Sequence, residues 1–407
     1  MSIFEKEERY FFHTYKRLKI EIDRGDGPYL IAKDGTRYLD MFGGIAVNAL
    51  GYNHPRINAA IMGQMKRYLH VSNTFYQDTQ VELGELLLKS SGFSKIFFTN
   101  SGTEAIEGAI KLSRKWGKVQ GKETIFGLTN SFHGRTFGAM SITGRDKYRD
   151  GYEPLLPNTR ILKFNDVDEL EKNVDDKTLA IVLEFIQGEG GINLVSPEYV
   201  AKLKQLRSAF GFLIVADEIQ SGMGRTGKMF AYQHYDIEPD VVVVAKAVGG
   251  GLPLGAFLGN GRVADVFTPG VHGTTFGGNP VACAAGLATV HEILHGGVME
   301  NAAAMGAHLQ DKLKGLRNSM PDLIRDVRGR GLMVGLDLTF DGTEVINRLI
   351  EKKVLLNLTD TTVIRWLPPL IVNEEHIGVA VEAVAATLSE MATSARMSQF
   401  AGSAVRS

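Results

Sequence analysis

Residues 241–251 read VVVVAKAVGGG and carry the most informative pattern of the chain. Four valines and an alanine form a continuously apolar run, without the alternation of a strand that has one face in water. Such a run is typical of a strand buried on both faces of a parallel sheet. Lys246 ends the run, although lysine side chains are seldom fully buried unless they are paired. This position therefore makes Lys246 a candidate functional residue.

Four other apolar runs repeat the pattern, at residues 96–99, 124–128, 180–183 and 212–216. Helical periodicity lies between several of them, most clearly at residues 103–116 and 197–210. Strands that alternate with helices indicate an α/β fold, with a mostly parallel sheet covered by helices and joined by right-handed crossovers.

The two ends of the chain show a different pattern. Residues 29–41 indicate a short hairpin with its turn at Asp34-Gly35. Helical stretches follow residue 285 or so, and residues 331–338 and 363–367 are strand candidates. This α+β pattern indicates a smaller domain built from both termini.

These patterns predict a large domain over residues 51–289 and a small domain over residues 1–50 and 290–392. The last stretch, residues 393–407, is rich in Ser and Ala and weakly patterned. We expect it to form a mobile tail.

The composition argues against several classes of protein. Of 407 residues, 44% are hydrophobic and 22% are charged, which argues against wholesale disorder. The 45 Lys and Arg nearly balance the 46 Asp and Glu without a basic block, so neither nucleic acid nor a membrane is an expected partner. No apolar run approaches the roughly 20 residues of a membrane span. Residues 1–9 are too charged for a signal peptide, and the single cysteine, Cys283, points to a reducing compartment, so we expect a cytoplasmic protein.

Three short motifs suggest other chemistry but lack parts that this chemistry needs. Residues 291–295 (HEILH) match the zinc motif H-E-x-x-H, but no third ligand lies at a typical spacing, so we expect no metal site. Residues 222–227 (GMGRTG) match the dinucleotide fingerprint G-x-G-x-x-G, but they do not lie directly between a strand and a helix. The same stretch nearly matches a nucleotide-binding P-loop, but Met229 stands where a magnesium-binding Ser or Thr is required.

Polar groups follow each predicted strand, at the sheet edge where open parallel sheets bind ligands. Residues 100–103 (NSGT) lead into a helix, and a helix N-terminus is suited to a phosphate. Phe132 and Arg135 offer an aromatic face and a guanidinium. Glu184 and Asp217 come directly after buried runs, where a carboxylate needs a partner.

Each of these groups also has an ordinary structural explanation, but together with Lys246 they fit one chemistry. A partly desolvated lysine has a lowered pKa and can form a Schiff base. A carboxylate can keep a pyridine nitrogen protonated, so that the ring acts as an electron sink. With a phosphate at the helix N-terminus and an aromatic ring stacked on the cofactor, the sequence predicts a pyridoxal-phosphate site.

Six stretches carry a family resemblance: residues 97–104 (FFTNSGTE), 132–136 (FHGRT), 186–191 (IQGEGG), 217–227 (DEIQSGMGRTG), 245–251 (AKAVGGG) and 273–280 (GTTFGGNP). On these motifs the chain resembles the class III aminotransferases, pyridoxal 5'-phosphate enzymes of fold type I, across nearly its whole length. The resemblance implies a homodimer with a shared active site, in which Thr275 reaches the cofactor phosphate of the neighbouring subunit.

The resemblance also implies roles for single residues. Lys246 is similar to the Schiff-base lysine and general acid/base, and Asp217 to the partner of the pyridine nitrogen. The implied cofactor-binding set is Ser101, Gly102, Thr103, Phe132, His133, Glu184, Asp217, Gln220, Lys246, Thr274 and Thr275. Arg135 would bind the amino donor, while Arg365 would take the α-carboxylate of 2-oxoglutarate and pair with Glu189 when the donor is bound.

Within the class, residues 43–51 (GGIAVNALG) and 132–135 (FHGR) look most like acetylornithine aminotransferases, whereas ornithine aminotransferases typically carry a tyrosine at the position of Gly44. The implied reaction moves the terminal amino group of N2-acetylornithine to 2-oxoglutarate. Ornithine, succinylornithine, 4-aminobutyrate or broad ω-amine transaminases are alternatives, as are a non-catalytic binder that kept the fold and a nucleotide-binding oxidoreductase. The chain departs from the family pattern at Ile106 and Phe185.

Overall fold

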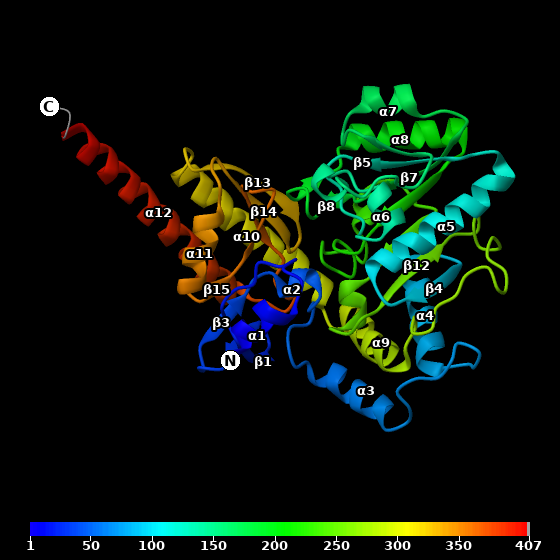
Figure 1. Ribbon diagram of the computed structural model, residues 1–407, viewed down its shortest axis with the longest axis horizontal. Helices are drawn as coiled ribbons and strands as arrows, with labels where there is room; N and C mark the ends of the chain where they lie inside the picture. The colour runs from blue at the N-terminus through cyan, green and yellow to red at the C-terminus, as the bar shows by residue number, and fades with distance from the viewer. Residues whose placement is uncertain (405–407) are drawn as a thin grey trace.

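The computed structural model describes the backbone of residues 1–404 and the side chains of residues 1–393. Figure 1 shows two halves, one around a large sheet and one around two smaller sheets. The chain forms the first half mainly with its middle and the second half with both of its ends. The domain boundaries at residues 50/51 and 289/290 stay predictions.

The large half contains a seven-stranded sheet in the order β4-β12-β11-β10-β7-β5-β6. These strands are β4 (Lys95–Thr99), β12 (Gly255–Gly259), β11 (Val241–Val244), β10 (Leu213–Asp217), β7 (Thr178–Leu183), β5 (Thr124–Leu128) and β6 (Thr159–Leu162). Strand β12 runs in the opposite direction to the other six strands, which are parallel to one another. The predicted α/β fold with a mostly parallel sheet is confirmed.

The continuous apolar runs arise because both faces of the sheet are covered. In β11, Val241 and Val243 belong to the core that includes α5 (Gly102–Gln120), whereas Val242 and Val244 belong to the larger core on the opposite face. Each of these valines is fully buried. A side chain of this size contributes roughly 1.5–3 kcal/mol when it is buried, so a polar residue inside this strand would be costly.

The two helices predicted between strands are both present. The second, α8 (Pro197–Phe210), has the predicted bounds, because Ser196 caps its first turn, Pro197 fits there without an N–H partner, and Gly211 ends it in a left-handed conformation. The other elements of this half are α3 (Pro55–Met65), α4 (Asp78–Ser91), α6 (Phe137–Ser141), η1 (Asp146–Tyr148), α7 (Val167–Asn173), β8 (Ile186–Gln187), β9 (Asn193–Leu194), η2 (Ala231–His234), η3 (Lys246–Gly249) and α9 (Pro280–His295).

The other half contains two four-stranded sheets, β1-β2-β3-β15 and β13-β14-β17-β16. Their strands are β1 (Ile22–Asp26), β2 (Tyr29–Ala32), β3 (Arg37–Asp40), β13 (Ile324–Arg330), β14 (Met333–Leu338), β15 (Val354–Leu355), β16 (Asn357–Thr359) and β17 (Val363–Trp366). The expected hairpin is β2–β3, and both expected strands are present as β14 and β17. The helical elements are α1 (Ile3–Tyr10), α2 (Gly43–Ala46), α10 (Val298–Ser319), α11 (Thr343–Glu351) and α12 (Glu374–Ala404).

Helix α12 continues through Ala404, and residues 405–407 lie outside the described residues. The mobility expected for residues 393–407 stays a prediction. Within the described residues, no single helix has the length and apolar character of a membrane span; α9 and α10 meet that test only as a pair, which is bent by 64°.

The glycine-rich loop GMGRTG joins the two halves. Arg225 is buried and donates hydrogen bonds to the backbone carbonyls of Leu332 and Pro368, and its own carbonyl accepts from Leu332 N at 3.0 Å. Burial without a carboxylate partner lowers the pKa of Arg225 to about 9. The loop therefore has a structural function that its G-x-G-x-x-G spacing does not reveal.

Helix α10 packs so closely on the start of β14 that a methyl group does not fit at Gly306. A Cβ there would lie 2.2 Å from the backbone of Gly331, whereas a Cβ at Gly315 of the same helix would meet nothing within 4 Å. We expect Gly306→Ala to lower the free energy of unfolding by about 1–3 kcal/mol through overpacking, and Gly315→Ala to raise it by about 0.5–1 kcal/mol through lower chain entropy. Urea unfolding of both variants checks this, and equal shifts would contradict the packing.

Candidate active site

Lys246 lies two residues after the last residue of β11, at the carboxyl edge of the sheet. Its backbone has a φ of 54°, in the left-handed region, and its side chain is half-buried. Desolvation lowers the pKa of Lys246 to about 8; the positive charge of Arg365 acts in the same direction, while Glu189 and Asp217 oppose it. No described side chain or carbonyl makes a hydrogen bond with Lys246 Nζ. The site therefore holds an amine that becomes neutral and nucleophilic near physiological pH.

Asp217 ends β10 and is buried beside His133. Its Oδ2 lies 2.7 Å from His133 Nδ1, and its Oδ1 accepts a hydrogen bond from Ile219 N at 3.0 Å. Burial alone would lower the pKa of His133, but the hydrogen bond and charge of Asp217, with the charge of Glu184, raise it. His133 and Asp217 thus share a buried hydrogen bond, and the carboxylate favours the protonated form of His133.

The two other buried carboxylates at this edge organise loops. Glu184 accepts hydrogen bonds from Phe132 N and Gly188 N, both at 3.0 Å. Burial raises its pKa to about 7, and the charge of His133 opposes that rise. It ties two site loops to the end of β7.

Glu218 accepts hydrogen bonds from Ser221 Oγ, Ala231 N and Tyr232 N at 2.7–2.9 Å. Burial raises its pKa to about 7 as well. All its partners belong to the loop between β10 and β11, so Glu218 fixes that loop whereas its neighbour Asp217 faces the site.

The start of α5 has free N–H groups at the position of the predicted anion site. Ser101 caps the helix by accepting from Glu104 N at 3.3 Å. The N–H groups of Gly102 and Thr103 donate to no described residue, and they stand at the positive end of a 19-residue helix. Thr274 approaches this turn through a 3.4 Å hydrogen bond from the Asn100 side chain. The geometry suits a bound phosphate.

Phe132 and Arg135 lie together beside an aromatic residue that the sequence analysis did not identify. The Phe132 ring packs edge-on against Tyr148, with centroids 5.5 Å apart. The Arg135 guanidinium carbon lies 3.9 Å from the centroid of the Tyr148 ring and 5.5 Å from that of Phe132. Tyr148 ends a one-turn 3-10 helix outside all the motifs, so no sequence pattern marks it.

Arg365 comes from the opposite half, on β17, and its side chain is 1% exposed. Its Nη1 donates to Glu189 Oε1 at 2.5 Å and to Gln220 Oε1 at 3.2 Å, and its Nε donates to Asn357 Oδ1 at 3.2 Å. Burial would raise the pKa of Glu189, but the charge and hydrogen bond of Arg365 lower it. The Arg365–Glu189 ion pair therefore joins the two halves at the site.

Gly188 leaves room for the Gln220 side chain beside Arg365, because a Cβ at Gly188 would lie 2.3 Å from Gln220 Oε1. The sequence does not point to Asn357, because only the pairing of β16 with β17 brings this residue opposite Arg365. Thr275, in contrast, is exposed and makes no described contact with the other site residues of its own chain.

The zinc-like motif lies elsewhere, at the end of α9. The rings of His291 and His295 are 4.8 Å apart, and Glu292 pairs with Arg56 of α3. Among the described residues, no three His, Cys, Asp or Glu side chains are grouped as metal ligands would be.

Comparison with known proteins identifies the family of the chain. Residues 10–388 match the family model for class III aminotransferases. The chain is 44% identical to the acetylornithine aminotransferase of Clostridium acetobutylicum, over 91% of this chain and 97% of that protein, and 43% identical to that of Aquifex aeolicus, over 91% and 98%.

Solved structures show the same fold. The ornithine aminotransferase of Toxoplasma gondii superposes with a TM-score of 0.92 at 28% identity, over 96% of this chain and 95% of that one. The acetylornithine aminotransferase of Elizabethkingia anophelis gives 0.84 at 30% identity, over 95% and 98%. The chain belongs to the class III aminotransferases, whose cofactor is pyridoxal 5'-phosphate.

The lowered pKa of Lys246 predicts a pH dependence for its reaction with an aldehyde. In the cofactor-free chain, pyridoxal phosphate can be trapped on the Lys246 peptide with borohydride. The trapped fraction should rise with pH, with its midpoint near pH 8, because only the neutral amine attacks the aldehyde. Arg365→Met should move the midpoint upward, since the charge of Arg365 lowers this pKa. Peptide mapping across the pH range checks both. Labelling of a different lysine, or a midpoint that Arg365→Met leaves unmoved, would contradict the assignment.

Proposed function

We propose that the chain transfers the δ-amino group of N2-acetylornithine to 2-oxoglutarate, giving N-acetylglutamate 5-semialdehyde and glutamate, a step of arginine biosynthesis. The observation that carries this proposal is a pair of arginines of opposite character: Arg365, whose charge reaches Lys246, is buried and paired with Glu189, whereas Arg135 is exposed and unpaired among the described residues. Such a site can bind two different carboxylates in turn. The names of the acetylornithine aminotransferases at 40–44% identity support this donor.

The residues at the strand ends fit the cofactor. The free N–H groups of Gly102 and Thr103 would hold its phosphate, Asp217 its ring nitrogen, and Phe132 its ring face, with Ser101, His133, Glu184, Gln220 and Thr274 around them. When bound, the cofactor supplies an electron sink for the carbon that carries the amine. Lys246 Nζ would form the covalent link to the cofactor and carry protons between substrate and cofactor carbons, which its lowered pKa permits.

Arg135 would bind the α-carboxylate of the donor with two parallel hydrogen bonds. The acyl group then needs space, which Gly44 would leave where ornithine aminotransferases typically carry a tyrosine. Gly43, Gly44 and the two residues that follow all have positive φ, and a Cβ at Gly43 would lie 3.0 Å from the carbonyl of Leu367, just after the strand of Arg365. A Cβ at Gly44 itself would lie 3.0 Å from the side-chain nitrogen of Asn48, so a larger residue there would displace that side chain.

Arg365 would bind the α-carboxylate of 2-oxoglutarate once Glu189 moves away. An unpaired buried guanidinium is costly, so Glu189 stabilises Arg365 while the donor occupies the site. Ornithine, succinylornithine, 4-aminobutyrate or broad ω-amine transamination remain the alternatives, and the ornithine aminotransferases among the similar structures favour the first of these.

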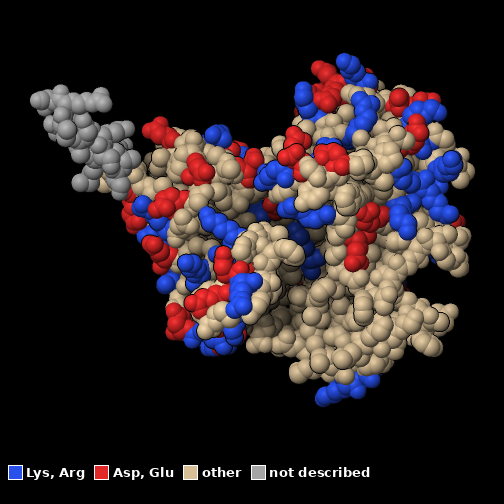
Figure 2. Space-filling view, in the orientation of Figure 1, with Lys and Arg blue, Asp and Glu red and all other residues tan. Residues whose placement is uncertain are grey.

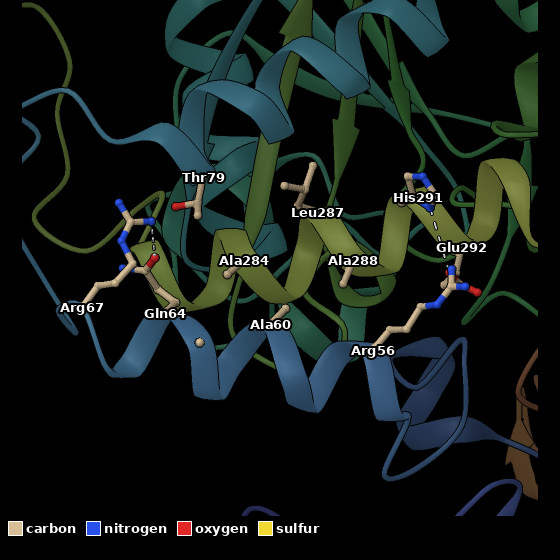
Figure 3. A pocket seen from close by; sticks show the side chains of 11 residues that line it. Arg56, Ala60, Gln64, Arg67, Thr79, Ala284, Leu287, Ala288, His291 and Glu292 are labelled. Carbon is tan, nitrogen blue, oxygen red and sulfur yellow. Dashed lines mark hydrogen bonds and ion pairs between the residues drawn. The ribbon is translucent and has the colours of Figure 1, made fainter.

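We also propose a homodimer that completes the site. Exposed apolar side chains cluster on α3 and nearby loops: Met62, Met65, Leu69, Phe75, Tyr76 and Phe276. Figure 2 shows this face nearly free of charge. A groove of about 560 Å³ between α3 and α9, lined in part by Ala60, Ala284 and Ala288, contains none of the cofactor residues (Figure 3). The exposed Thr275, next to Phe276, would reach the partner's cofactor phosphate.

The cytoplasm is the compartment we propose. Cys283, the single cysteine of the sequence, is fully buried on α9, and burial raises the pKa of its thiol to about 12. A chain with a single cysteine forms no intramolecular disulfide, which is typical of proteins in a reducing compartment.

The adjacent carboxylates Asp217 and Glu218 should have different roles, so that replacing each by its amide has a different effect. Asp217→Asn should reduce the rate of proton removal from the donor by at least about 100-fold, because a neutral amide does not keep the ring nitrogen protonated. Glu218→Gln should mainly lower thermal stability, since that residue bonds only to the loop between β10 and β11. Pre-steady-state absorbance and thermal unfolding of both variants separate the two roles. Equal catalytic losses would contradict them.

The donor assignment is tested by kcat/KM for N2-acetylornithine, N2-succinylornithine, ornithine and 4-aminobutyrate in one buffer. We expect an acylated ornithine to exceed ornithine by about tenfold or more, because free ornithine loses the acyl contacts and brings a charged ammonium near the arginines. Arg135→Lys should reduce kcat/KM for the preferred donor strongly, since lysine cannot make two parallel bonds to a carboxylate. If ornithine or 4-aminobutyrate equals the acylated donors, the acyl-ornithine assignment is wrong.

A further inference from the structure

The ring of Tyr148 is surrounded by cations at the edge of the site. Arg135 Cζ lies 3.9 Å from its centroid, Lys147 Nζ 5.0 Å and Arg145 Cζ 5.8 Å. Figure 2 shows Lys and Arg side chains gathered around the hollow between the two halves. An aromatic ring face attracts cations at these distances.

Arg135 depends on aromatic rings for its orientation. Within residues 1–393, whose side chains the structure describes, no carboxylate or carbonyl pairs with its guanidinium, and the side chain is exposed. A free arginine loses rotamer freedom when it binds a carboxylate, whereas one that is already oriented loses less. Contact through the ring face also uses none of the N–H donors of Arg135, so all of them stay available to a substrate.

Tyr148 itself is fixed by the turn that carries it. Its backbone N–H donates to the carbonyl of Arg145 at 3.0 Å, and the Arg145 guanidinium donates to the carbonyl of Glu189. On its other side the ring packs edge-on against Phe132. The ring is thus held between Phe132 and Arg145, which bonds to the loop of Glu189, at a position that suits the support of Arg135.

We propose that Tyr148 is a positioning residue for the donor, which orients Arg135 toward the donor's α-carboxylate through the face of its ring. The proposal rests on the proposed function, in which Arg135 takes that carboxylate. Tyr148→Phe keeps the ring and should keep this effect, whereas Tyr148→Leu removes it. Tyr152→Leu, an exposed tyrosine four residues further on, is the matched control.

The test compares donors with and without the carboxylate. Tyr148→Leu should raise KM for N2-acetylornithine about fivefold, the effect of a cation–π contact of moderate strength, and leave KM for N-acetyl-1,4-diaminobutane unchanged, because that amine lacks the carboxylate. In Tyr148→Phe and Tyr152→Leu, KM for both donors should stay within about twofold of the wild-type value. Calorimetry with N2-acetylnorvaline, which keeps the carboxylate but has no reactive amine, should show the same fivefold weakening without turnover.

Equal increases of KM for both donors, or an unchanged Kd for N2-acetylnorvaline, would overturn the role of Tyr148. A wild-type enzyme that prefers ornithine would instead overturn the proposed donor. In that case KM for ornithine and for 1,4-diaminobutane is compared in Tyr148→Leu. A higher KM for ornithine alone supports the positioning role of Tyr148, and equal increases of KM for both amines refute it.

Discussion

The ion pair between Arg365 and Glu189 is the contact on which the site depends, because it joins a strand of one half to a loop of the other. Its arginine is almost fully buried, and removing one partner of a buried pair leaves an uncompensated charge, at a cost of about 3–5 kcal/mol. The position of β17 is in turn fixed by Arg225, whose guanidinium bonds to the backbone on both sides of the β14–β17 pair. The charge of Arg365 also reaches Lys246 and lowers its pKa. The docking of the halves and the reactivity of the lysine are thus linked.

The parallel sheet explains how so many charges can be brought together inside the protein. Its strands are apolar on both faces, so polar side chains are placed only where strands end. Each buried charge there has a specific partner: Asp217 has His133, and Glu184 has two backbone N–H groups. Lys246 alone has none among the described residues, so it is the group left available for chemistry.

Much of this arrangement could be predicted from sequence, since strand ends follow from apolar runs and the motifs name most of the site. Strand β12 was harder to predict: it has a glycine at each end and runs antiparallel to both of its neighbours, so its pattern does not stand out. Asn357 depends on strand register and Tyr148 on the path of a loop, neither of which a local pattern encodes. Ile106 and Phe185, where the chain departs from the family pattern, are both fully buried in the cores. At such positions the stability depends more on the volume of the side chain than on its identity.

The central claim is that one site binds two different acids in turn by making and breaking the Arg365–Glu189 pair. The most direct test is single-turnover measurement of kcat/KM for each half-reaction, with donor and with 2-oxoglutarate, in the wild type, Arg365→Met and Glu189→Gln. We expect Arg365→Met to reduce kcat/KM of the 2-oxoglutarate half at least about tenfold more than that of the donor half, through the loss of a charged hydrogen bond, and Glu189→Gln to shift the ratio of the two values in the opposite direction. Equal reductions of both half-reactions in Arg365→Met would contradict the central claim.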